Sequence, residues 1–522
     1  MPRPDVDSPN VAAPLDDDEP LRKLSVTRLV LLIAVVATAI GFGYHATRKA
    51  LAGPAPKTAK SWFAPYVDTT LTPVYPFESS ASMPARQVAL GFVTAVGHDC
   101  TPGWGGVYSL DHADQTLSLG ARIAQLRING VQPIASFGGS AHTSLALACK
   151  TPETLAAAYQ RVVQHYRFRT IDLDIETTTL ADQDAVRRNA DAIRLLQQSN
   201  PGLHVWVTLP VEPSGLQRDA ADIVHGLLAA RVRLAGVNVM TMDFVRAPNS
   251  GESMASLVDA ALQSTHAQLS KIFAAHGVSA SSREVWSHLG ATVMIGQNDA
   301  QGQRYTTSDA HALVAFANRT GLARVSMWSV NRDTQCGTVY SLNGIRSNTC
   351  SGTAQGALEF SKTFGALNGV APKGTSSSDL TELPPQPDTN PAHAPFPMWS
   401  AQQPYPKGYK VVQAGNIYEA LWYTSGADPS AQAHTGTDGP WLLIGPVLPG
   451  SKPPTVTTVA PGTYPDWQTS ASYHVGDTVQ FAGLPYQAKW ANQGASPGNA
   501  MNDPYGNPWK PLYSIPGEPS LP

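Results

Sequence analysis

Three carboxylates alternate with branched apolar residues in one short stretch of this chain. Asp172, Asp174 and Glu176 stand two residues apart, with isoleucine or leucine between them. A β-strand directs every second side chain to the same face, so the three acids share one face. Crowded carboxylates raise one another's pKa, and a carboxyl with a raised pKa can act as a general acid near neutral pH. The spacing predicts such an acid; the alternative is a solvent-facing strand whose acids are merely hydrated.

The segments before this strand favour the general acid. The run from Pro133 to Gly139 is a second short apolar segment that ends in small residues, and residues 152–166 have a helical pattern. A strand, a helix and a strand in this order predict a βαβ unit. Its parallel strands would be covered by helices, so the acids would lie in a packed domain.

Four motifs resemble those of the chitinases of glycoside hydrolase family 18, and they occur in the family's order. They are S-x-G-G ending at Gly139, D-x-D-x-E ending at Glu176, M-T-M-D ending at Asp243, and V-S-M-W-S, which contains Trp328. The resemblance implies an α/β fold, the (β/α)8 TIM barrel, whose active site lies at the carboxyl ends of the strands. It also implies an endo-acting glycoside hydrolase that cleaves chitin.

The resemblance further implies a role for each acid. Glu176 would protonate the glycosidic oxygen, and Asp174 would orient the substrate's 2-acetamido group, which attacks the anomeric carbon with overall retention. Asp172 would share a proton with Asp174. The expected substrate-binding residues are Asp243, Met242, Trp328, Gly138, Gly139 and, in a loop after the first predicted strand, Trp104. Chitin or N-acetylglucosamine oligomers are the implied partners, and no metal or other cofactor is implied.

Two positions depart from the family pattern. Arg169 and Thr170 stand where the family has Asp-Gly, and Met242 stands where many members carry a tyrosine. The motifs M-T-M-D and D-L-D-I-E are similar to those of a bacterial and archaeal subgroup of chitinases. Two other functions stay open: an endo-β-N-acetylglucosaminidase acting on glycoprotein or cell-wall glycans, and a catalytically weak or inactive chitin-binding surface lectin.

Alternating apolar and helical segments predict that the barrel spans residues 85–370. A closed barrel needs eight strands, and we expect the least obvious one around Val107 to Leu110. The other seven predicted strands are Gln87 to Val93, Ile134 to Ser136, Ile171 to Ile175, Val205 to Leu209, Gly236 to Met240, Thr292 to Ile295 and Arg324 to Trp328.

The last third of the chain contains an aromatic-rich repeat. Residues 395–446 and 463–514 share Trp, Tyr, Gly and Pro positions at a constant offset, as in Trp441 and Trp509. The pattern resembles chitin-binding modules of carbohydrate-binding families 5 and 12, whose exposed rings stack on sugars. The candidate binding residues are Trp422, Tyr423, Trp441, Trp490 and Trp509. The alternative for each tryptophan is a place in a small core.

Composition narrows the function classes. The formal net charge is −3 and charged residues are 14% of the chain, which gives no electrostatic case for nucleic acid as a partner. The four cysteines lack the close spacing of zinc sites and allow three pairings. We favour Cys100 with Cys149, because each follows a predicted strand on the same rim of the barrel, and Cys336 with Cys350, because they would close a short loop after Trp328. Free thiols are the alternative, but an exported chain usually oxidises such pairs.

Export is expected from the amino-terminal residues. Residues 1–24 are predicted to be a disordered cytoplasmic tail, and the apolar segment 25–47 is a transmembrane signal anchor or a signal peptide. The protein would then be extracellular or at the cell surface, with the membrane as a partner if the segment is uncleaved. Residues 48–84, 371–394 and 447–462 are expected to be linkers rich in Pro, Ser or Thr.

Overall fold

The computed structural model describes residues 61–337, 346–367, 369, 387–432, 439–453, 458–499 and 506–513. The predictions for residues 1–24 and 25–47, and for most of the linker 371–394, therefore lie outside the described residues. Within the described ranges, no helix has the length and apolar character needed to cross a membrane.

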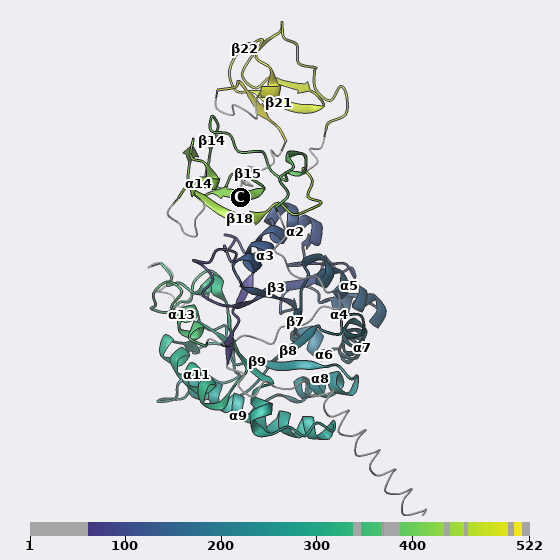
Figure 1. Cartoon of the computed structure of the whole chain (residues 1–522), viewed down its shortest axis with the longest axis vertical. Helices are drawn as coiled ribbons and strands as arrows, with labels where there is room; N and C mark the ends of the chain where they lie inside the picture. Colours follow the sequence, from purple (N-terminus) through teal and green to yellow (C-terminus); the bar gives the residue numbers. More distant parts are fainter. Residues whose placement is uncertain are drawn as a thin grey trace, which may run out of the picture. The chain divides into compact units, whose positions relative to one another are not determined.

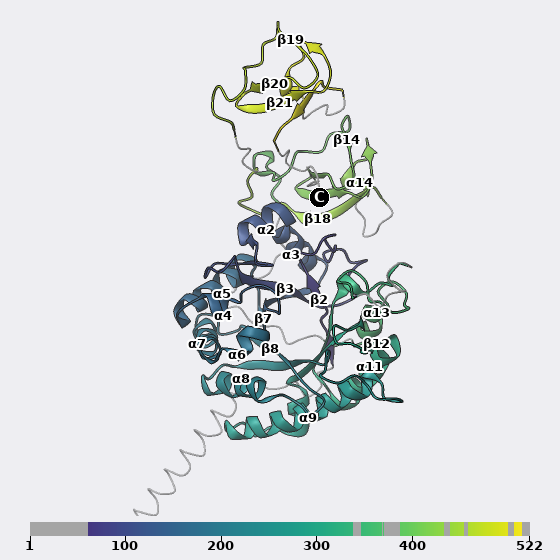
Figure 2. The same ribbon diagram turned by 180° about the vertical axis from the view of Figure 1, so that it is seen from behind.

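A parallel sheet forms the centre of the larger domain (Figures 1 and 2). Its neighbours in order are β13, β10, β9, β8, β7, β6 and β3, and all six pairings between them are parallel. These strands are β3 (Gln87–Ala95), β6 (Gln132–Gly138), β7 (Thr170–Asp174), β8 (His204–Pro210), β9 (Leu234–Met240), β10 (Leu289–Met294) and β13 (Arg324–Trp328). Five contain the whole apolar run predicted from the sequence, and β7 and β10 each end one residue before the predicted run does.

The eighth strand lies before the predicted start of the barrel. β1 (Trp62–Phe63) pairs with β13, and β2 (Tyr66–Asp68) pairs with β3, both in parallel. Between them, the Ala64 N–H donates to the carbonyl of Val325 and the Pro65 carbonyl accepts from Ala89, each at 2.9 Å. This one segment thus closes the sheet into a barrel, and the expectation that residues 48–84 form only a linker is wrong.

The segment expected to supply the eighth strand has another structure. β5 (Tyr108–Ser109) pairs antiparallel with β4 (Pro102–Trp104), and β4 pairs antiparallel with β3. The chain then enters α2 (Leu110–Leu117), whose first turn is capped by the Ser109 hydroxyl. Apolar residues at 107–110 therefore belong to a hairpin edge and a helix start, and not to a barrel strand.

Helices lie around the outside of the barrel (Figure 1). α5 (Pro152–Tyr166) has the predicted bounds, because Thr151 caps its amino end and Pro152 occupies a first-turn position where no amide donor is needed. Its buried residues recur at helical spacing and face the sheet. The other longer helices are α3 (Leu119–Ile128), α7 (Gln183–Ser199), α8 (Arg218–Ala229), α9 (Met254–Ala275) and α11 (Thr307–Thr320).

The barrel interior is filled by aromatic side chains. Trp62, Tyr66 and Trp206 are buried in one cluster, with Phe92 and Trp328 packed against it. A separate and larger apolar core lies between the strands and the helices. The interior cluster fills the space directly beneath the ends of the strands that carry the acids.

The repeat in the last third is also a structural repeat. In the first unit β15 (Lys410–Gln413), β16 (Asn416–Ala420) and β18 (Trp441–Pro446) form an antiparallel sheet; in the second, β20 (Thr478–Phe481), β21 (Leu484–Ala488) and β23 (Trp509–Pro511) do so. Equivalent hydrogen bonds recur: the indole N–H of Trp441 donates to Ala427, and that of Trp509 to Ala495, each at 2.8 Å. Each unit is therefore a small β module.

Two disulfides join the cysteines in the favoured pairing. Cys100 bonds to Cys149, and Cys336 bonds to Cys350.

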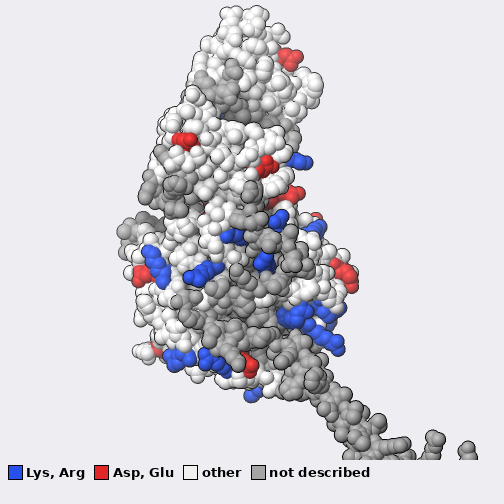
Figure 3. Space-filling view, in the orientation of Figure 1, with Lys and Arg blue, Asp and Glu red and all other residues white. Residues whose placement is uncertain are grey.

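On the face seen in Figure 3, charged side chains are scattered over the barrel, while the surface of the two β modules is mostly uncharged.

Candidate active site

Asp172 lies inside the barrel and accepts four hydrogen bonds from other strands. Its Oδ2 accepts from the hydroxyls of Tyr66 and Ser136, both at 2.8 Å. Its Oδ1 accepts from the Thr208 hydroxyl at 2.7 Å and from Arg324 Nη1 at 2.9 Å. Side chains from β2, β6, β8 and β13 thus hold both oxygens of Asp172, and the proton that the sequence predicts it to share with Asp174 stays a prediction.

Arg324 and Asp172 form an ion pair with no exposed side-chain surface on either partner. The guanidinium also donates through Nε to the Ser326 hydroxyl at 2.8 Å. Its central carbon lies 5.4 to 5.8 Å from the ring centres of Trp62, Tyr66 and Trp206, within the range of cation–π attraction. The sequence motif did not indicate this cation, since it stands at the first position of a distant strand.

Asp174 is buried one step further along the same face of β7. Its side chain is 6% exposed, and its Oδ1 has no hydrogen-bond partner. Burial, followed by the charges of Glu176 and Asp172, raises its pKa well above the ordinary value, while Arg324 acts in the opposite direction. The carboxyl therefore holds a proton readily and keeps one oxygen free for another group.

Glu176 lies two residues beyond the end of β7, at the N-cap position of the short helix α6 (Thr177–Ala181). Burial, and then the negative charge of Asp243, raises the pKa of Glu176 to about 7. A carboxyl that is half protonated near neutral pH can give a proton and later take one back. The predicted general acid thus has the electrostatic surroundings that its role needs.

Two glycines allow β6 to approach the acidic strand. Gly138 has φ +106, and a Cβ there would lie 2.1 Å from the carbonyl oxygen of Asp174. Gly139 has φ +86, and a Cβ would meet the ring of Phe92 at 3.0 Å. Both were predicted as substrate-binding residues. Their contacts show that they make room for Asp174 and for an aromatic side chain.

A pair of stacked rings lies beside the acids. Phe92 and Trp328 have ring centres 5.5 Å apart and planes inclined by 20°, and both are partly exposed. Tyr66 contacts both rings from below, at 6.1 and 6.3 Å. Trp328 ends β13 and is partly exposed, and its role as the floor of a sugar site stays a prediction. Phe92 was missed, although its place at the end of a barrel strand could have indicated it.

Asp243 is held by a loop from the neighbouring barrel segment. Its Oδ1 accepts from the backbone N–H of Ala300 at 2.7 Å, and its own N–H donates to the Asn298 side chain at 3.4 Å. Burial raises the pKa of Asp243, while its bond to Ala300 opposes the rise. Met242, the residue before it, is half-buried and has no hydroxyl to offer a substrate.

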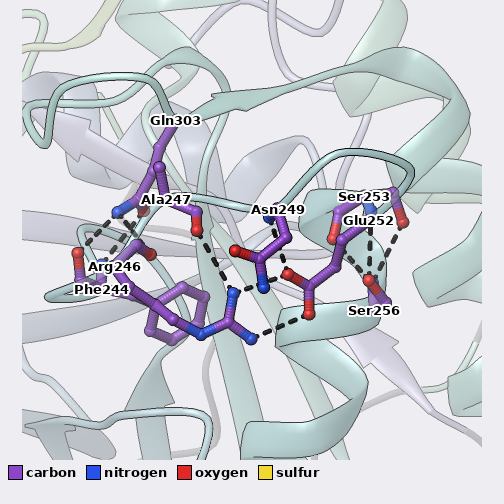
Figure 4. A network of polar contacts seen from close by, with 8 residues as sticks. All are labelled: Phe244, Arg246, Ala247, Asn249, Glu252, Ser253, Ser256 and Gln303. Carbon is purple, nitrogen blue, oxygen red and sulfur yellow. Dashed lines mark hydrogen bonds and ion pairs between the residues drawn. The ribbon is translucent and has the colours of Figure 1, made fainter.

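The loop that continues from Asp243 is braced by polar contacts (Figure 4). The amide of Gln303 accepts from the N–H of Phe244 at 3.1 Å and donates to the carbonyl of Arg246 at 3.2 Å. The guanidinium of Arg246 meets both oxygens of Glu252, at 2.6 and 2.8 Å. A loop with so many bonds can hold the Asp243 charge in one place beside Glu176.

Two other sequence positions do not present a side chain to the site. Trp104 is 0% exposed and packs edge-on against Tyr166 with ring centres 5.8 Å apart, so the expectation that it holds a sugar is wrong. Arg169 precedes β7, at the opposite end of that strand from Glu176. Arg169, which departs from the family pattern, therefore lies at the end of β7 that is far from Glu176.

In the β modules the candidate rings divide into two groups. Trp422, Tyr423 and Trp490 are 46%, 62% and 41% exposed. Trp441 and Trp509 are 2% and 1% exposed and form the cores of their modules, so their assignment as binding residues is wrong. The small sheets need a large ring at their centre, and these two tryptophans supply it.

The fold and the site define a class: a (β/α)8 barrel with a protonatable carboxyl pair at the carboxyl end of its strands and a pair of stacked aromatic rings. No family model matches the chain. A probable bifunctional chitinase/lysozyme of Escherichia coli (strain K12) is 30% identical over 304 residues, or 56% of this chain and 33% of that protein. Endochitinase 11 of Metarhizium anisopliae is 30% identical over 298 residues, or 55% of each chain. The chain spans about a third and about half the length of these curated relatives.

Solved structures agree with these relatives. Active domain 2 of a chitinase from Pyrococcus furiosus is 27% identical, with a TM-score of 0.52 over 59% of this chain and 97% of that one. The same domain complexed with chito-oligosaccharides is 28% identical, with a TM-score of 0.52 over 61% and 97%. The comparisons thus support the resemblance to family 18 chitinases and the class of glycoside hydrolase for the barrel.

Proposed function

We propose that this chain is a chitinase that hydrolyses the β-1,4 bonds between N-acetylglucosamine units. The observation that carries the proposal is the acidic strand β7, where a buried Asp174 stands next to a Glu176 whose pKa is raised to about 7. The names of the relatives, and a solved neighbour complexed with chito-oligosaccharides, support the same substrate. Neither alternative function is favoured by these comparisons.

The proposed reaction uses the substrate's own acetamido group. Glu176 gives its proton to the glycosidic oxygen, and the acetamido carbonyl oxygen attacks the anomeric carbon as the bond to the leaving group breaks. Asp174, with its free Oδ1, orients the acetamido group and stabilises the oxazolinium ion. Water, deprotonated by Glu176, then opens that ion from the opposite face, so the anomeric configuration is retained. Phe92 and Trp328 offer an apolar floor for the sugar ring.

The proposal extends to the two β modules as chitin-binding units. Trp422 with Tyr423 in the first, and Trp490 in the second, are exposed rings. Lys489 lies 4.6 Å from the ring centre of Trp490, so the two modules present different surroundings to a sugar. Binding units attached to a catalytic domain raise its effective concentration at an insoluble polymer.

We also propose that the protein acts outside the cell or at its surface. Two disulfides support an oxidising compartment. Fractionation of cells that express the full chain, with mass analysis of its amino terminus, tests this. A full-length chain in the membrane fraction supports an anchor, a shortened chain in the medium supports a cleaved signal, and reduced protein in the cytoplasm contradicts export.

The test of the activity compares the full chain with two variants, on colloidal chitin and on soluble N-acetylglucosamine oligomers. Glu176→Gln removes the acid, and Glu153→Gln makes the same chemical change on the exposed first turn of α5. Oligomer release by the parent and by Glu153→Gln, but not by Glu176→Gln, is the expected result. Chitin binding without products from any of the three contradicts the enzyme and leaves a lectin, whereas cleavage of glycoprotein glycans alone leaves an endo-β-N-acetylglucosaminidase.

A further inference from the structure

Arg324 is a buried cation for which the general-acid mechanism has no use. It lies at the start of β13 and has no exposed surface. The barrel accommodates it closely: a Cβ on Gly290, its partner on β10, would meet the Cβ of Arg324 at 3.1 Å. A guanidinium does not lose its proton in proteins, so a fixed positive charge stands inside the barrel.

The groups around Asp172 favour its charged form. All four hydrogen bonds to its carboxylate come from donors, and the Arg324 guanidinium has no lone pair with which to accept a proton. The Thr208 hydroxyl already accepts from the Asn238 amide at 3.0 Å. A proton placed on Oδ1 would therefore break the bond to Thr208 or to Arg324, because neither can accept it. A proton on either oxygen would leave Arg324 without its counter-ion.

We propose that Arg324 is a positioning residue that keeps Asp172 ionised, so that the proton of the acidic strand resides on Asp174 and is exchanged with Glu176, not with Asp172. The proposal rests on the proposed function for its kinetic consequences only. The ionised state of Asp172 is a property of the folded protein, whether or not the protein turns over a substrate.

A fixed charge on Asp172 has a direct effect on its neighbour. Asp174 lies on the same face of β7, is 6% exposed and has an unpartnered Oδ1. A negative charge beside it favours the protonated carboxyl. The neutral Asp174 can then offer one oxygen as an acceptor to the acetamido N–H and add no negative charge next to Glu176. Arg324 thus acts through Asp172 on the two acids that contact the substrate.

The surrounding groups leave few other charges to consider. The side chains that contact the Asp172 carboxylate are Tyr66, Ser136, Thr208 and Arg324, and Asp174 is its titratable neighbour on β7. The groups behind them are neutral: Asn238 donates to Thr208 and Thr292, and Ser326 accepts from Arg324. Among the described residues, Arg324 is the cation that pairs with Asp172, and its charge also acts on Asp174. Its removal is therefore the sharpest available perturbation.

The first measurement needs no catalysis. Aspartate labelled with ¹³C at the carboxyl reports ionisation by its chemical shift, and Asp172→Asn identifies the resonance of Asp172. In the parent we expect that resonance to keep the shift of a carboxylate from about pH 4 to about pH 9. In Arg324→Met we expect it to show a titration step. A step in the parent, or no step in Arg324→Met, overturns the proposal.

The second measurement is the pH profile of kcat/KM on soluble oligomers. In Arg324→Met a proton can move to Asp172, Asp174 becomes an anion, and the basic limb shifts to higher pH by about half a unit or more. Arg324→Lys restores a cation and is expected to return the limb toward that of the parent. An unchanged limb in Arg324→Met overturns the proposal.

A matched control separates this effect from lost stability. Arg122→Met on α3 removes another buried ion pair, between Arg122 Nη2 and Glu78 at 2.8 Å. Arg122→Met is expected to lower the melting temperature and to leave the pH profile of kcat/KM unchanged. If its basic limb shifts as much as that of Arg324→Met, the proposal is overturned. If Arg324→Met does not fold, the parent resonance and the Arg324→Lys profile still decide. An ionised Asp172 in a chain that cleaves no chitin defeats the proposed function alone.

Discussion

Glu176 connects catalysis with stability. Its pKa is raised to about 7 in the folded chain by burial and by Asp243, so the folded state binds this proton more tightly than the unfolded state does. The stability that comes with the protonated group is fully present below about pH 4.5 and is lost as the pH rises through about 7. The acid that the reaction needs therefore costs stability at neutral and alkaline pH.

Glu176→Gln should reveal both sides of this relation. We expect kcat to fall by about two to four orders of magnitude because the general acid is gone. At about pH 8 we expect the variant to be more stable than the parent by up to about 3 kcal/mol, because no charge is buried. The difference should become small near pH 4. Urea unfolding at both pH values checks this, and a gain that does not depend on pH would contradict it.

The charge of Asp243 should set the basic limb of the activity profile. Asp243→Asn removes a negative charge that raises the pKa of Glu176. Glu176 should then lose its proton at lower pH, and we expect the basic limb of kcat/KM to move down by about half a unit or more. Asp184→Asn, at an exposed carboxylate on α7, is the matched control. A limb that moves equally in both variants, or in neither, would refute the role of Asp243.

At the scale of elements, β6 and β7 must lie close together for the acids to be held. Gly138→Ala places a methyl 2.1 Å from the Asp174 carbonyl, at a φ of +106 that alanine avoids. We expect a loss of at least about 2 kcal/mol in unfolding free energy and a large loss of kcat. Gly130→Ala, with φ +80 and open space around it, isolates the conformational cost of about 1 kcal/mol. Equal losses in the two variants would show that the close approach is unimportant.

The elements also show what the sequence could and could not predict. Long alternating or apolar runs such as β7 and β8 were recognised because their period and length are strong signals. The closing segment β1–β2 was missed because Pro65 divides it and it pairs with two different strands. Such a short, interrupted strand is set by its partners and not by its own pattern.

The same reasoning applies to the site. The acids and Trp328 were found because family motifs mark them. Arg324, Tyr66 and Phe92 were missed because their importance comes from strands that meet only in the closed barrel. Trp104 was misplaced because a tryptophan beside glycines can be a loop ring or, as here, a buried one. The exposure of a ring depends on which residues pack against it in the folded chain, and the order of residues along one sequence does not specify those contacts.

In the whole molecule, the two β modules should add affinity for an insoluble polymer. We expect Trp422→Ala and Trp490→Ala each to weaken binding to chitin by about tenfold, because each removes an exposed ring. The double variant should bind little more than the barrel does alone, since two weak tethered contacts act together. Depletion onto chitin, with Glu176→Gln as the background to prevent hydrolysis, measures this.

The buried core tryptophans of the β modules provide a control, because their loss should unfold a module whereas loss of an exposed ring should not. Trp441→Ala removes a core ring that is 2% exposed and donates to Ala427, and it should cost about 3 to 5 kcal/mol, enough to unfold so small a module. Loss of binding should then accompany loss of near-UV circular dichroism, whereas Trp422→Ala should keep the folded spectrum. If Trp422→Ala and Trp490→Ala bind chitin as the parent does, the exposed rings serve another partner, and the effect of the modules on activity must be independent of chitin.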